Sequence, residues 1–513
     1  MAIESEREFG LSVLQRLDNE LRTRGDMFRK RGTQDVKAFR TLEPDAVLPR
    51  ILLIIDEFQE LFVEDDRIAQ ESALLLDRLV RQGRAFGIHV LLGSQTLGGA
   101  YTLARSTIGQ MAVRIALQCS EADSHLILSE DNTAARLLTR PGEAIYNDAN
   151  GLYEGNHPFQ IVWLDDHQRD AYLNHITQLA QQRHIAAPPP IVFEGNVLAD
   201  LADNPVLKGL IESPQWPERT PAVPAWLGSA VAIKDPTNAM FLRQNGSNVL
   251  MVGHREEAAL GVLASCFLSL AAQHAPSGNG AARGTEEVVG ETSSMPQDSS
   301  RQPPPSPSNQ DQTGAKFYIL DGMRSDAPEF GFWKRLADAV PQTVKIGGIR
   351  ETPEIMAEIT ADLAARQQHA HDNSPPVYLL LYNLGRFREL RREDDFAFSG
   401  SDDQPANPAK QFTTILREGP PLGIHTAIWC DTYSNVARML DRQSLQDFEM
   451  RILFQMNGND SSSLMDSPEA SRLGVHRAIL YDEGQGLIEK FRPYGLPSAE
   501  YLAWVKKHLH GRG

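Results

Sequence analysis

The sequence predicts an α/β protein of two related domains in tandem, each with a mainly parallel sheet. The first observation is a set of short apolar runs without alternation, such as "ILLIIDEF" at 51 and "GIHVLLGSQ" at 87. Strands buried on both faces of a parallel sheet have this pattern. The second observation is the helical pattern at 67–86 between these two runs, because strand–helix–strand order implies a right-handed crossover.

The third observation is an internal repeat. "GIHVLLGSQT" at 87 recurs as "GIHTAIWCDT" at 423, and "VRIALQCSEADS" at 113 recurs as "MRILFQMNGNDS" at 450. "GEAIYNDANG" at 142 resembles "HRAILYDEGQG" at 476, and the strand at 51 resembles "VYLLLYNL" at 377. Four matches in the same order indicate two copies of one domain. They align Arg114 with Arg451.

The elements of the first copy follow from periodicity. Leucines at helical spacing among charged residues predict a helix over 4–31. Strands are expected at 49–55, 87–95 and 111–119, the third joining the same parallel sheet.

Proline-rich stretches mark the domain boundaries. We expect a first domain at 1–185, a Pro-rich connection at 186–235 and a second domain at 236–513. Residues 276–314 are rich in Pro, Ser, Gln and Gly, so they bury too little apolar surface to offset the entropy of ordering. They are interpreted as a disordered insert in the second domain.

Composition limits the function classes. The net charge of −17 and pI of about 5.3 argue against a surface coated for nucleic acid, although a local basic channel stays open. Three widely separated cysteines fit a reduced compartment and no zinc site. We find no signal peptide and no apolar run near the ~20 residues that span a bilayer. A cytoplasmic protein is expected, with any membrane tether coming from another segment.

Asp56 and Glu57 follow the first buried strand. They are either two solvated acids at a strand end or a Walker B pair. In the second case Asp56 holds magnesium with the nucleotide and Glu57 orients the attacking water. Gln95, at the tip of the next strand, is either a loop-capping amide or a sensor of the γ-phosphate. Arg114 is either a strand-edge arginine paired with a carboxylate or an arginine finger.

These motifs together resemble the FtsK/SpoIIIE family of P-loop motor ATPases. The resemblance rests on "LPRILLIIDEFQELF", "GRAFGIHVLLGSQTL", "VRIALQCSEADSHLIL" and "AARLLTRPGEAIYND" in that order, within residues 10–165. It implies RecA-like domains in a hexameric ring, ATP and Mg²⁺ as cofactors, Glu57, Gln95 and Arg114 as catalytic residues, and Asp56 and Glu57 at the nucleotide.

The phosphate-binding loop of that family is not evident. Its GxxxxGK[ST] pattern lets backbone amides and one lysine hold the phosphates, but the chain contains no Gly-Lys pair. The first domain begins too close to its Walker B strand to include the loop. We expect a truncated gene, a mis-assigned start or one half of a split protein, with an N-terminal ATPase part elsewhere.

The second domain has the loop's place without its chemistry. In "SNVLMVGHREEAALGVLASCFLSLA", Gly253 stands at the first glycine and Ala259 at the lysine. The sequence alignment puts Asn383 at the Walker B acid, Asp431 at the sensor and Arg451 at the finger. This domain is interpreted as a degenerate RecA-like domain, as in EccC-like chains, which string such domains together and drive protein secretion.

Two functions follow from the resemblance. The main one is an ATP-driven translocase of double-stranded DNA, of the kind used in cell division and chromosome partition. The alternative is a type VII secretion-like ATPase, or a non-catalytic regulatory subunit, that handles protein cargo. In both cases we expect this chain not to hydrolyse ATP alone.

Overall fold

The computed structural model describes residues 2–3, 6–96, 105–185, 193–194, 197–276, 314–368, 374–392 and 407–512. The chain divides into unit 1 (Met1–Gly195 with Val231–Ile233) and unit 2 (Asn196–Ala230 with Lys234–Gly513). The predicted disordered insert falls almost entirely outside the described residues. Among the described residues, no helix combines the length and the apolar character needed to cross a bilayer.

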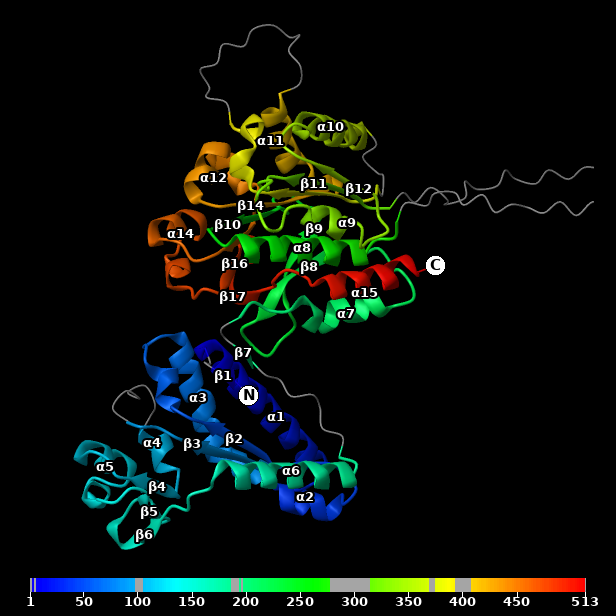
Figure 1. Ribbon diagram of the computed structural model, residues 1–513. Coiled ribbons are helices and arrows are strands. Elements are labelled where there is room, and N and C mark those ends of the chain that lie inside the picture. The colour runs from blue at the N-terminus through cyan, green and yellow to red at the C-terminus, as the bar shows by residue number, and fades with distance from the viewer. Residues whose placement is uncertain are drawn as a thin grey trace, which may run out of the picture. The chain divides into compact units, whose positions relative to one another are not determined.

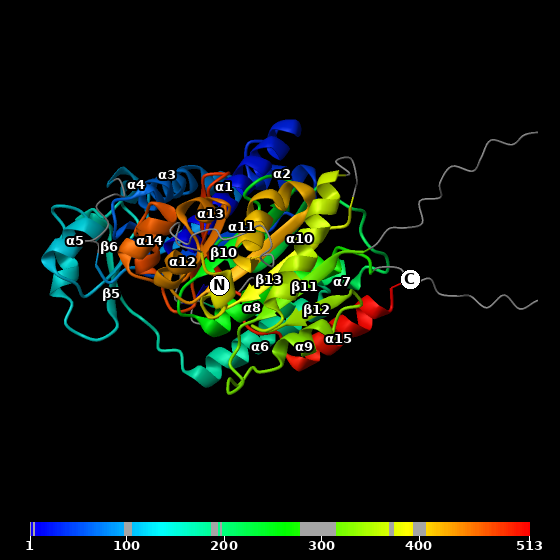
Figure 2. The ribbon, with the colours of Figure 1, turned by 90° about the horizontal axis from the view of Figure 1, so that it is seen from above.

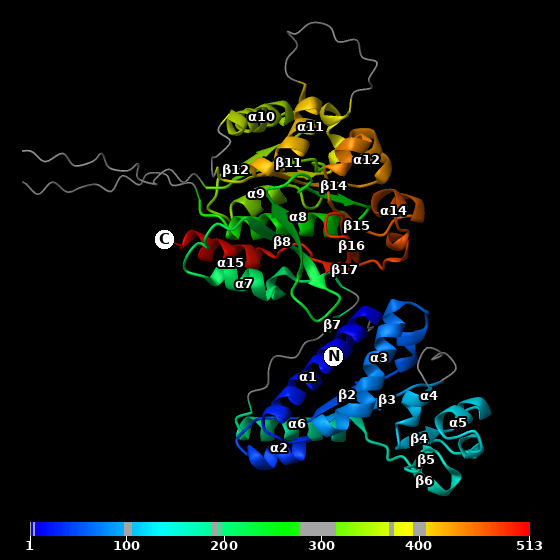
Figure 3. The same ribbon diagram turned by 180° about the vertical axis from the view of Figure 1, so that it is seen from behind.

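Strands β2 and β3 of unit 1 form a small parallel sheet. Strand β2 pairs with β3 from Ile51↔Ile88 to Ile55↔Leu92. Helices α1 and α3 lie side by side (Figures 1 and 3) and bury Leu14, Leu53 and Leu76 in one core. The elements of unit 1 are β1 (Ala2–Ile3), α1 (Arg7–Lys30), α2 (Val36–Leu42), β2 (Ile51–Ile55), η1 (Phe58–Phe62), α3 (Arg67–Gln82), η2 (Gly83–Phe86), β3 (Ile88–Leu92), α4 (Arg105–Gly109), β4 (Arg114–Leu117), α5 (Glu121–Ile127), β5 (Glu143–Asn147), β6 (Asn156–Gln160), α6 (Asp166–Gln182) and β7 (Phe193–Glu194).

The third predicted strand is present but belongs to another sheet. Strand β4 pairs antiparallel with β5, and β5 pairs antiparallel with β6. The expectation that it extends the parallel sheet of β2 and β3 is therefore wrong for the described residues. Unit 2 gives the physical reason, because there an additional strand stands between the corresponding two pieces.

Unit 2 contains one continuous sheet of order β12-β11-β13-β14-β10-β15-β16-β17-β8-β9. The strands from β12 to β15 are parallel and those from β15 onward are antiparallel. The elements are α7 (Pro205–Glu212), β8 (Ala222–Ala230), β9 (Thr237–Leu242), β10 (Val249–Val252), α8 (Glu256–Ala272), β11 (Lys316–Asp321), α9 (Phe332–Ala337), β12 (Val344–Gly347), α10 (Thr352–Gln368), β13 (Val377–Tyr382), η6 (Leu384–Arg386), α11 (Pro408–Glu418), η8 (Pro420–Leu422), β14 (Ile424–Cys430), α12 (Tyr433–Met439), α13 (Arg442–Gln446), β15 (Met450–Leu453), α14 (Gly458–Met465), β16 (Ala478–Asp482), β17 (Leu487–Pro493) and α15 (Ala499–His510).

Helices cover both faces of the unit 2 sheet. Figure 1 shows α8, α9 and α15 on one side and α10, α11 and α12 on the other, and Figure 2 shows α10 and α11 side by side from above. Helix α8 is buried at every position from Ala258 to Ala272. A helix that is apolar all round belongs in a core, and α8 is the central helix of this one.

Most of the stretch predicted as a Pro-rich connection, from Asn196 to Ala230, is instead part of unit 2. Its residues form α7 and β8, and β8 joins the large sheet. Pro224 misled the assignment because proline lacks an N–H for the ladder. Proline is tolerated here because β17 pairs only with Gly228–Ala230 of β8. At Pro224, β8 therefore has a hydrogen-bonded neighbour, β9, on one side only.

The two units share more than the sequence motifs. Arg24 of α1 donates to the Phe86 carbonyl at 2.8 Å, and Arg366 of α10 donates to the Leu422 carbonyl at the same distance. Each accepting residue precedes a left-handed glycine, Gly87 at φ 76° and Gly423 at φ 78°. The same contact therefore anchors α1 in unit 1 and α10 in unit 2.

Candidate active site

The acidic pair lies where β2 ends beside β3. Glu57 has a left-handed backbone (φ 51°), which turns the chain into η1. The Gly93 N–H donates to the Ile55 carbonyl at 2.8 Å, and the Phe58 N–H donates to the Gly93 carbonyl at 3.1 Å. These two bonds hold the carboxyl ends of the strands together, with Asp56 exposed between them.

The structure brings Glu57 and Gln95 together. Oε2 of Glu57 accepts from the Gln95 N–H at 3.3 Å and from Nε2 of Gln59 at 2.5 Å. The hydrogen bond from Gln59 lowers the pKa of Glu57, burial opposes it, and the bonds from Gln95 lower the pKa further. The carboxylate is therefore ionised at neutral pH and fixed in place.

Sequence reasoning missed Gln59 and Ser94. Oγ of Ser94 donates to Oε1 of Gln59 at 2.5 Å, so a relay of three side chains links the two strand ends to Glu57. The sequence carries no signal for this pair. Gln59 stands out only in the structure, where it is buried although it is polar.

Asp56 fits a role as magnesium ligand. A Cβ placed on Gly93 would lie 3.0 Å from Oδ1 of Asp56, so glycine is what leaves room beside this carboxylate. Exposed carboxylate oxygen is the ligand type that Mg²⁺ prefers. No cluster of three or more His, Cys, Asp or Glu suited to an all-protein metal site occurs in the part of the chain that the structure describes.

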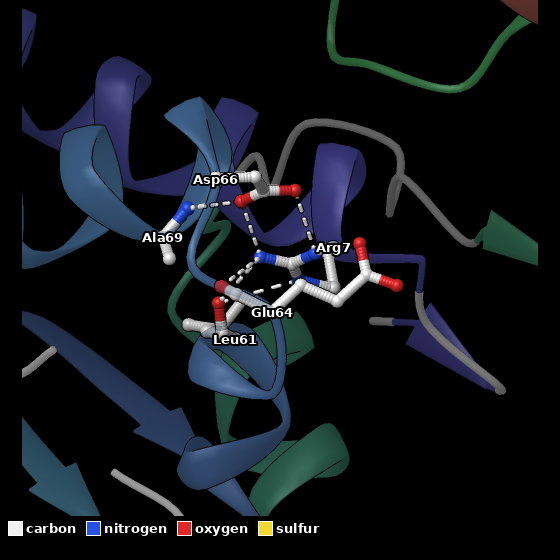
Figure 4. A network of polar contacts seen from close by, with 5 residues as sticks. All are labelled: Arg7, Leu61, Glu64, Asp66 and Ala69. Atoms are coloured by element: carbon white, nitrogen blue, oxygen red, sulfur yellow. Dashed lines mark hydrogen bonds and ion pairs between the residues drawn. The ribbon is translucent and has the colours of Figure 1, made fainter. Parts of the chain in front are cut away.

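An ion pair supports the segment that follows Glu57. Arg7 at the start of α1 binds Asp66 through both guanidinium arms, at 2.7 and 2.9 Å, and donates to the Leu61 carbonyl at 3.2 Å (Figure 4). Asp66 also accepts from the Ala69 N–H at 2.9 Å, which caps α3. Burial raises the pKa of Asp66, but the bonds from Arg7 and Ala69 outweigh it and lower the pKa. The network fixes η1 between α1 and α3.

Arg114 lies at the start of β4, and its guanidinium is engaged by backbone carbonyls. Nε donates to Met111 at 3.2 Å, Nη1 to Ile127 at 3.1 Å and also to Leu128, and Nη2 to Ile108 at 3.5 Å. Burial lowers the pKa of Arg114. The sequence predicted either a carboxylate partner or an arginine finger. In this conformation the side chain instead closes the loops around β4.

The counterparts of the acidic pair in unit 2 are shifted by one residue from the sequence alignment. Ile51 and Val377 each donate to the carbonyl of the left-handed glycine that precedes the next strand, both at 2.9 Å. Counted from there, Asn383 corresponds to Glu57, and it shares the left-handed backbone at φ 67°. Asn383 was aligned with Asp56, which is wrong, because β13 is one residue longer than β2. The residue of unit 2 that corresponds to Asp56 in the repeat is Tyr382.

Aromatic rings occupy the corresponding place in unit 2. The rings of Tyr382 and Trp429 are 4.8 Å apart, and both side chains are buried. Nε1 of Trp429 donates to the Gly253 carbonyl at 3.0 Å. Trp429 corresponds to Gly93 in the repeat. The glycine that leaves room beside Asp56 in unit 1 is therefore replaced in unit 2 by tryptophan, the largest side chain.

The loop at Gly253 is too short to cradle phosphates. Helix α8 begins at Glu256, and the Ala259 N–H donates to the Arg255 carbonyl at 2.8 Å inside the helix. The amide at the lysine position is thus used by the helix, and Ala259 is buried. Asp431, at the sensor position, accepts from Nδ2 of Asn435 at 2.7 Å. Gly253, Asn383 and Asp431 lie at the carboxyl ends of the neighbouring strands β10, β13 and β14, without the groups needed to bind phosphate, whereas Arg451 lies at the start of β15.

The comparisons with known proteins agree on one fold. No protein-family model matches the chain. The ESX secretion system protein YukB of Bacillus subtilis (strain 168) is 27% identical over 166 residues, which are 31% of this chain and 10% of YukB. The cytoplasmic domain of the Thermomonospora curvata type VII secretion ATPase EccC matches 98% of this chain and 56% of its own length, at a TM-score of 0.56 and 18% identity.

Two structures of consecutive ATPase domains extend the likeness. Thermomonospora curvata EccC (ATPases 2 and 3), in complex with a signal sequence peptide, matches 96% of this chain at a TM-score of 0.52 and 13% identity, over 78% of its own length. EssC (ATPases 2 and 3) from Geobacillus thermodenitrificans matches 94% at a TM-score of 0.50 and 14% identity, over 78% of its own length. The fold is that of the tandem P-loop ATPases EccC and EssC.

The chain spans only part of the length of the relatives that it matches. It covers a tenth of YukB and about half of the EccC cytoplasmic domain. The predicted fold class, with two RecA-like P-loop domains in tandem, is confirmed.

Proposed function

We propose that this chain belongs to a secretion ATPase of the EccC and EssC kind, in which unit 1 provides the Walker B side of a nucleotide site. The observation that carries the proposal is the contrast between the two copies. Unit 1 keeps Asp56 and Glu57 at the strand end with Gly93 beside them, and unit 2 fills the same place with Tyr382 and Trp429. Retention of the acids in only one copy points to a chemical role for them.

The residues of unit 1 have distinct roles in this proposal. Bound Mg·ATP would supply an electrophilic phosphate, with Asp56 as the protein ligand that holds the ion. Glu57 is a weak base because its pKa is lowered, so it orients and polarises water through an oxygen atom rather than removing a proton outright. Gln59 and Gln95 keep that carboxylate in place.

Unit 2 is proposed as a structural and regulatory domain that does not bind nucleotide. Its substituted loop and its buried aromatic pair leave no place for a nucleotide among the described residues. The feature that remains is the large continuous sheet, which suits a structural role. Arg451 serves that structure, because it joins Oε2 of Glu483 at 2.7 Å and three backbone carbonyls.

Protein cargo is favoured over double-stranded DNA. The net charge of −17 opposes a sequence-independent attraction to phosphate backbones. One of the similar EccC structures holds a signal sequence peptide, whereas the DNA translocase function rests on the FtsK/SpoIIIE resemblance alone. Self-association in a ring and a membrane location through another segment stay proposals at the level of the family.

Fluorescence anisotropy tests the cargo. The full chain is titrated against a secretion signal peptide and against a DNA duplex that carry the same fluorescent label, at two salt concentrations. We expect saturable peptide binding that changes little with salt, and no DNA binding at physiological salt. Tight DNA binding that weakens steeply with salt, without peptide binding, would restore the translocase function.

A further inference from the structure

Asp123 of α5 connects that helix to the segment that follows β3. Its Oδ2 accepts a hydrogen bond from Oγ of Ser120 at 2.7 Å, and its N–H donates to the same Oγ at 3.1 Å, which caps α5. Its Oδ1 accepts from Oγ1 of Thr96 at 3.0 Å. The two carboxylate oxygens therefore have different partners, one in the helix cap and one beside the candidate active site.

The bond to Thr96 restrains the segment that holds Glu57 in place. The N–H of Gln95 donates to Oε2 of Glu57 at 3.3 Å. Oγ of Ser94 lies within hydrogen-bond distance of Oε1 of Gln59 and of the Thr96 carbonyl, and Nε2 of Gln59 binds the same glutamate carboxylate. Gln95 lies between the two bonded residues, so its backbone is fixed from both sides.

The sheet alone does not fix this segment. The ladder of β2 and β3 ends at Leu92, and the backbone bonds of Gly93 extend it by one residue. Residues 94–96 lie beyond the ladder, and Gln95 and Thr96 are exposed. A short exposed segment of this kind samples many backbone conformations unless further bonds hold it. Asp123, itself held in the cap of α5, supplies such a bond at the far end of the segment.

The second copy separates helix capping from this anchoring role. In unit 2 the counterpart Asp460 joins the cap of α14, because its Oδ2 accepts from Nδ2 of Asn457 at 2.7 Å and its N–H donates to Oδ1 of Asn457 at 2.9 Å. The repeat places Thr432 at the position of Thr96, but its Oγ1 accepts from the Asn435 N–H at 3.1 Å and caps α12. Among the described residues the bond between threonine and aspartate occurs in the copy that keeps the acidic pair and not in the other. Capping therefore does not account for it.

We propose that Asp123 is a positioning residue of the candidate active site in unit 1. Through its bond to Thr96 it keeps the N–H of Gln95 on the carboxylate of Glu57. It acts through the segment 94–96 and not on the reacting atoms. The holding of the carboxylate follows from these contacts, and the orientation of water by that carboxylate rests on the proposed function.

Exchange of the Gln95 amide with water tests the positioning. It is measured by NMR at neutral pH on the full chain labelled with ¹⁵N-glutamine, and the resonance is assigned from Gln95→Ala. Thr96→Val removes the hydroxyl that binds Asp123 and keeps the size of the side chain. We expect about tenfold faster exchange in Thr96→Val and in Asp123→Ala, because the amide spends more time without its acceptor. Asp123→Asn keeps an oxygen for the Thr96 hydroxyl and should restore slow exchange.

Ser120→Ala separates the anchor from the helix cap. It removes the cap of α5 but not the bond to Thr96, so it should speed exchange within α5 and leave the Gln95 amide as it is. The Gln70 amide, which donates to the Asp66 carbonyl at 3.1 Å at the start of α3, should keep its rate in every variant. A Gln95 amide that is unchanged in Thr96→Val, or that changes equally in Ser120→Ala, overturns the positioning.

Hydrolysis separates this proposal from the proposed function. It is measured in a longer polypeptide in which a GxxxxGK[ST] loop precedes this chain. If the Gln95 amide responds as expected but Glu57→Gln leaves hydrolysis unchanged, the positioning holds and the proposed function fails. If Glu57→Gln abolishes hydrolysis while Asp123→Ala changes neither the Gln95 exchange nor kcat, the proposed function holds and the positioning is wrong.

Discussion

Arg114 and Arg451 donate hydrogen bonds to backbone carbonyls at the same positions relative to themselves. In both cases Nε donates to the residue three before, Nη2 to the residue six before and Nη1 to the residue thirteen after. Unit 2 lacks the groups for hydrolysis, yet its arginine makes the same contacts. The shared geometry assigns this arginine to closing the loops around a strand, and an arginine finger is not needed to explain it.

Replacement of Arg114 should therefore cost stability. Arg114→Ala leaves several carbonyls without a donor, and each buried unsatisfied polar group costs about 1–3 kcal/mol. We expect a lower unfolding midpoint for unit 1 in urea and faster hydrogen exchange at β4 and β5. Arg136→Ala is the control, because Arg136 makes an exposed ion pair with Glu121 and should have little effect. A fully stable Arg114→Ala protein would contradict the structural role.

Gln59 should control the ionisation of Glu57. Gln59→Ala removes the largest influence that lowers the pKa of Glu57, so this pKa should rise toward the ordinary value of 4.5. Titration of ¹³C-labelled glutamate carboxyl groups by NMR measures the change directly. Gln70→Ala, an exposed glutamine on α3, should leave the titration as it is. An unchanged pKa in Gln59→Ala would show that the relay from Ser94 does not hold the carboxylate.

Unit 2 should not respond to nucleotide. Trp429 is buried and bonded to the Gly253 carbonyl, so bound Mg·ATP could reach this place only by displacing the ring. In protein labelled with 5-fluorotryptophan, the Trp429 resonance, assigned from Trp429→Phe, should keep its position as Mg·ATP is added. A saturable shift of that resonance would mean that unit 2 still binds nucleotide.

The stability of unit 2 should fall with acid. Burial lowers the pKa of His425 and of His274 to about 4, from an ordinary value of 6.5. Between pH 6.5 and 4 the unfolded chain binds protons that the folded chain does not, so stability decreases as the pH falls through this range. Urea unfolding at several pH values should show this slope, and His425→Gln should flatten it. His510→Gln, at an exposed position near the C-terminus, should not change it.

The sequence predicted those features of the fold that a local pattern of residues determines. The unbroken apolar run Ile51–Ile55 and the recurring motifs were enough to predict β2, β3 and the tandem. The predicted burial of the whole first strand is wrong, because Leu52 and Ile54 are exposed. Asp56, Glu57 and Gln95 were singled out because they follow such apolar runs, and their catalytic roles stay a prediction.

The remaining features depend on tertiary contacts. The Gln59–Ser94 relay joins two loops whose approach no local pattern encodes. The one-residue shift at Asn383 reflects the longer β13, and register is fixed by pairing rather than by motif. Pro224 was taken as a linker residue because its permissive edge position becomes visible only once β17 is placed.

The central claim is that hydrolysis belongs to the acids of unit 1 and not to their counterparts in unit 2. The most direct test is the kcat for ATP of a longer polypeptide in which a GxxxxGK[ST] loop precedes this chain, compared between the variants Glu57→Gln and Asn383→Gly. Both positions are left-handed, and the substituted glycine tolerates that backbone. Loss of a residue that positions and polarises the attacking water should lower kcat about 10²–10⁴-fold in Glu57→Gln, and Asn383→Gly should keep it. Hydrolysis that survives Glu57→Gln, or that is lost equally in Asn383→Gly, would contradict the account.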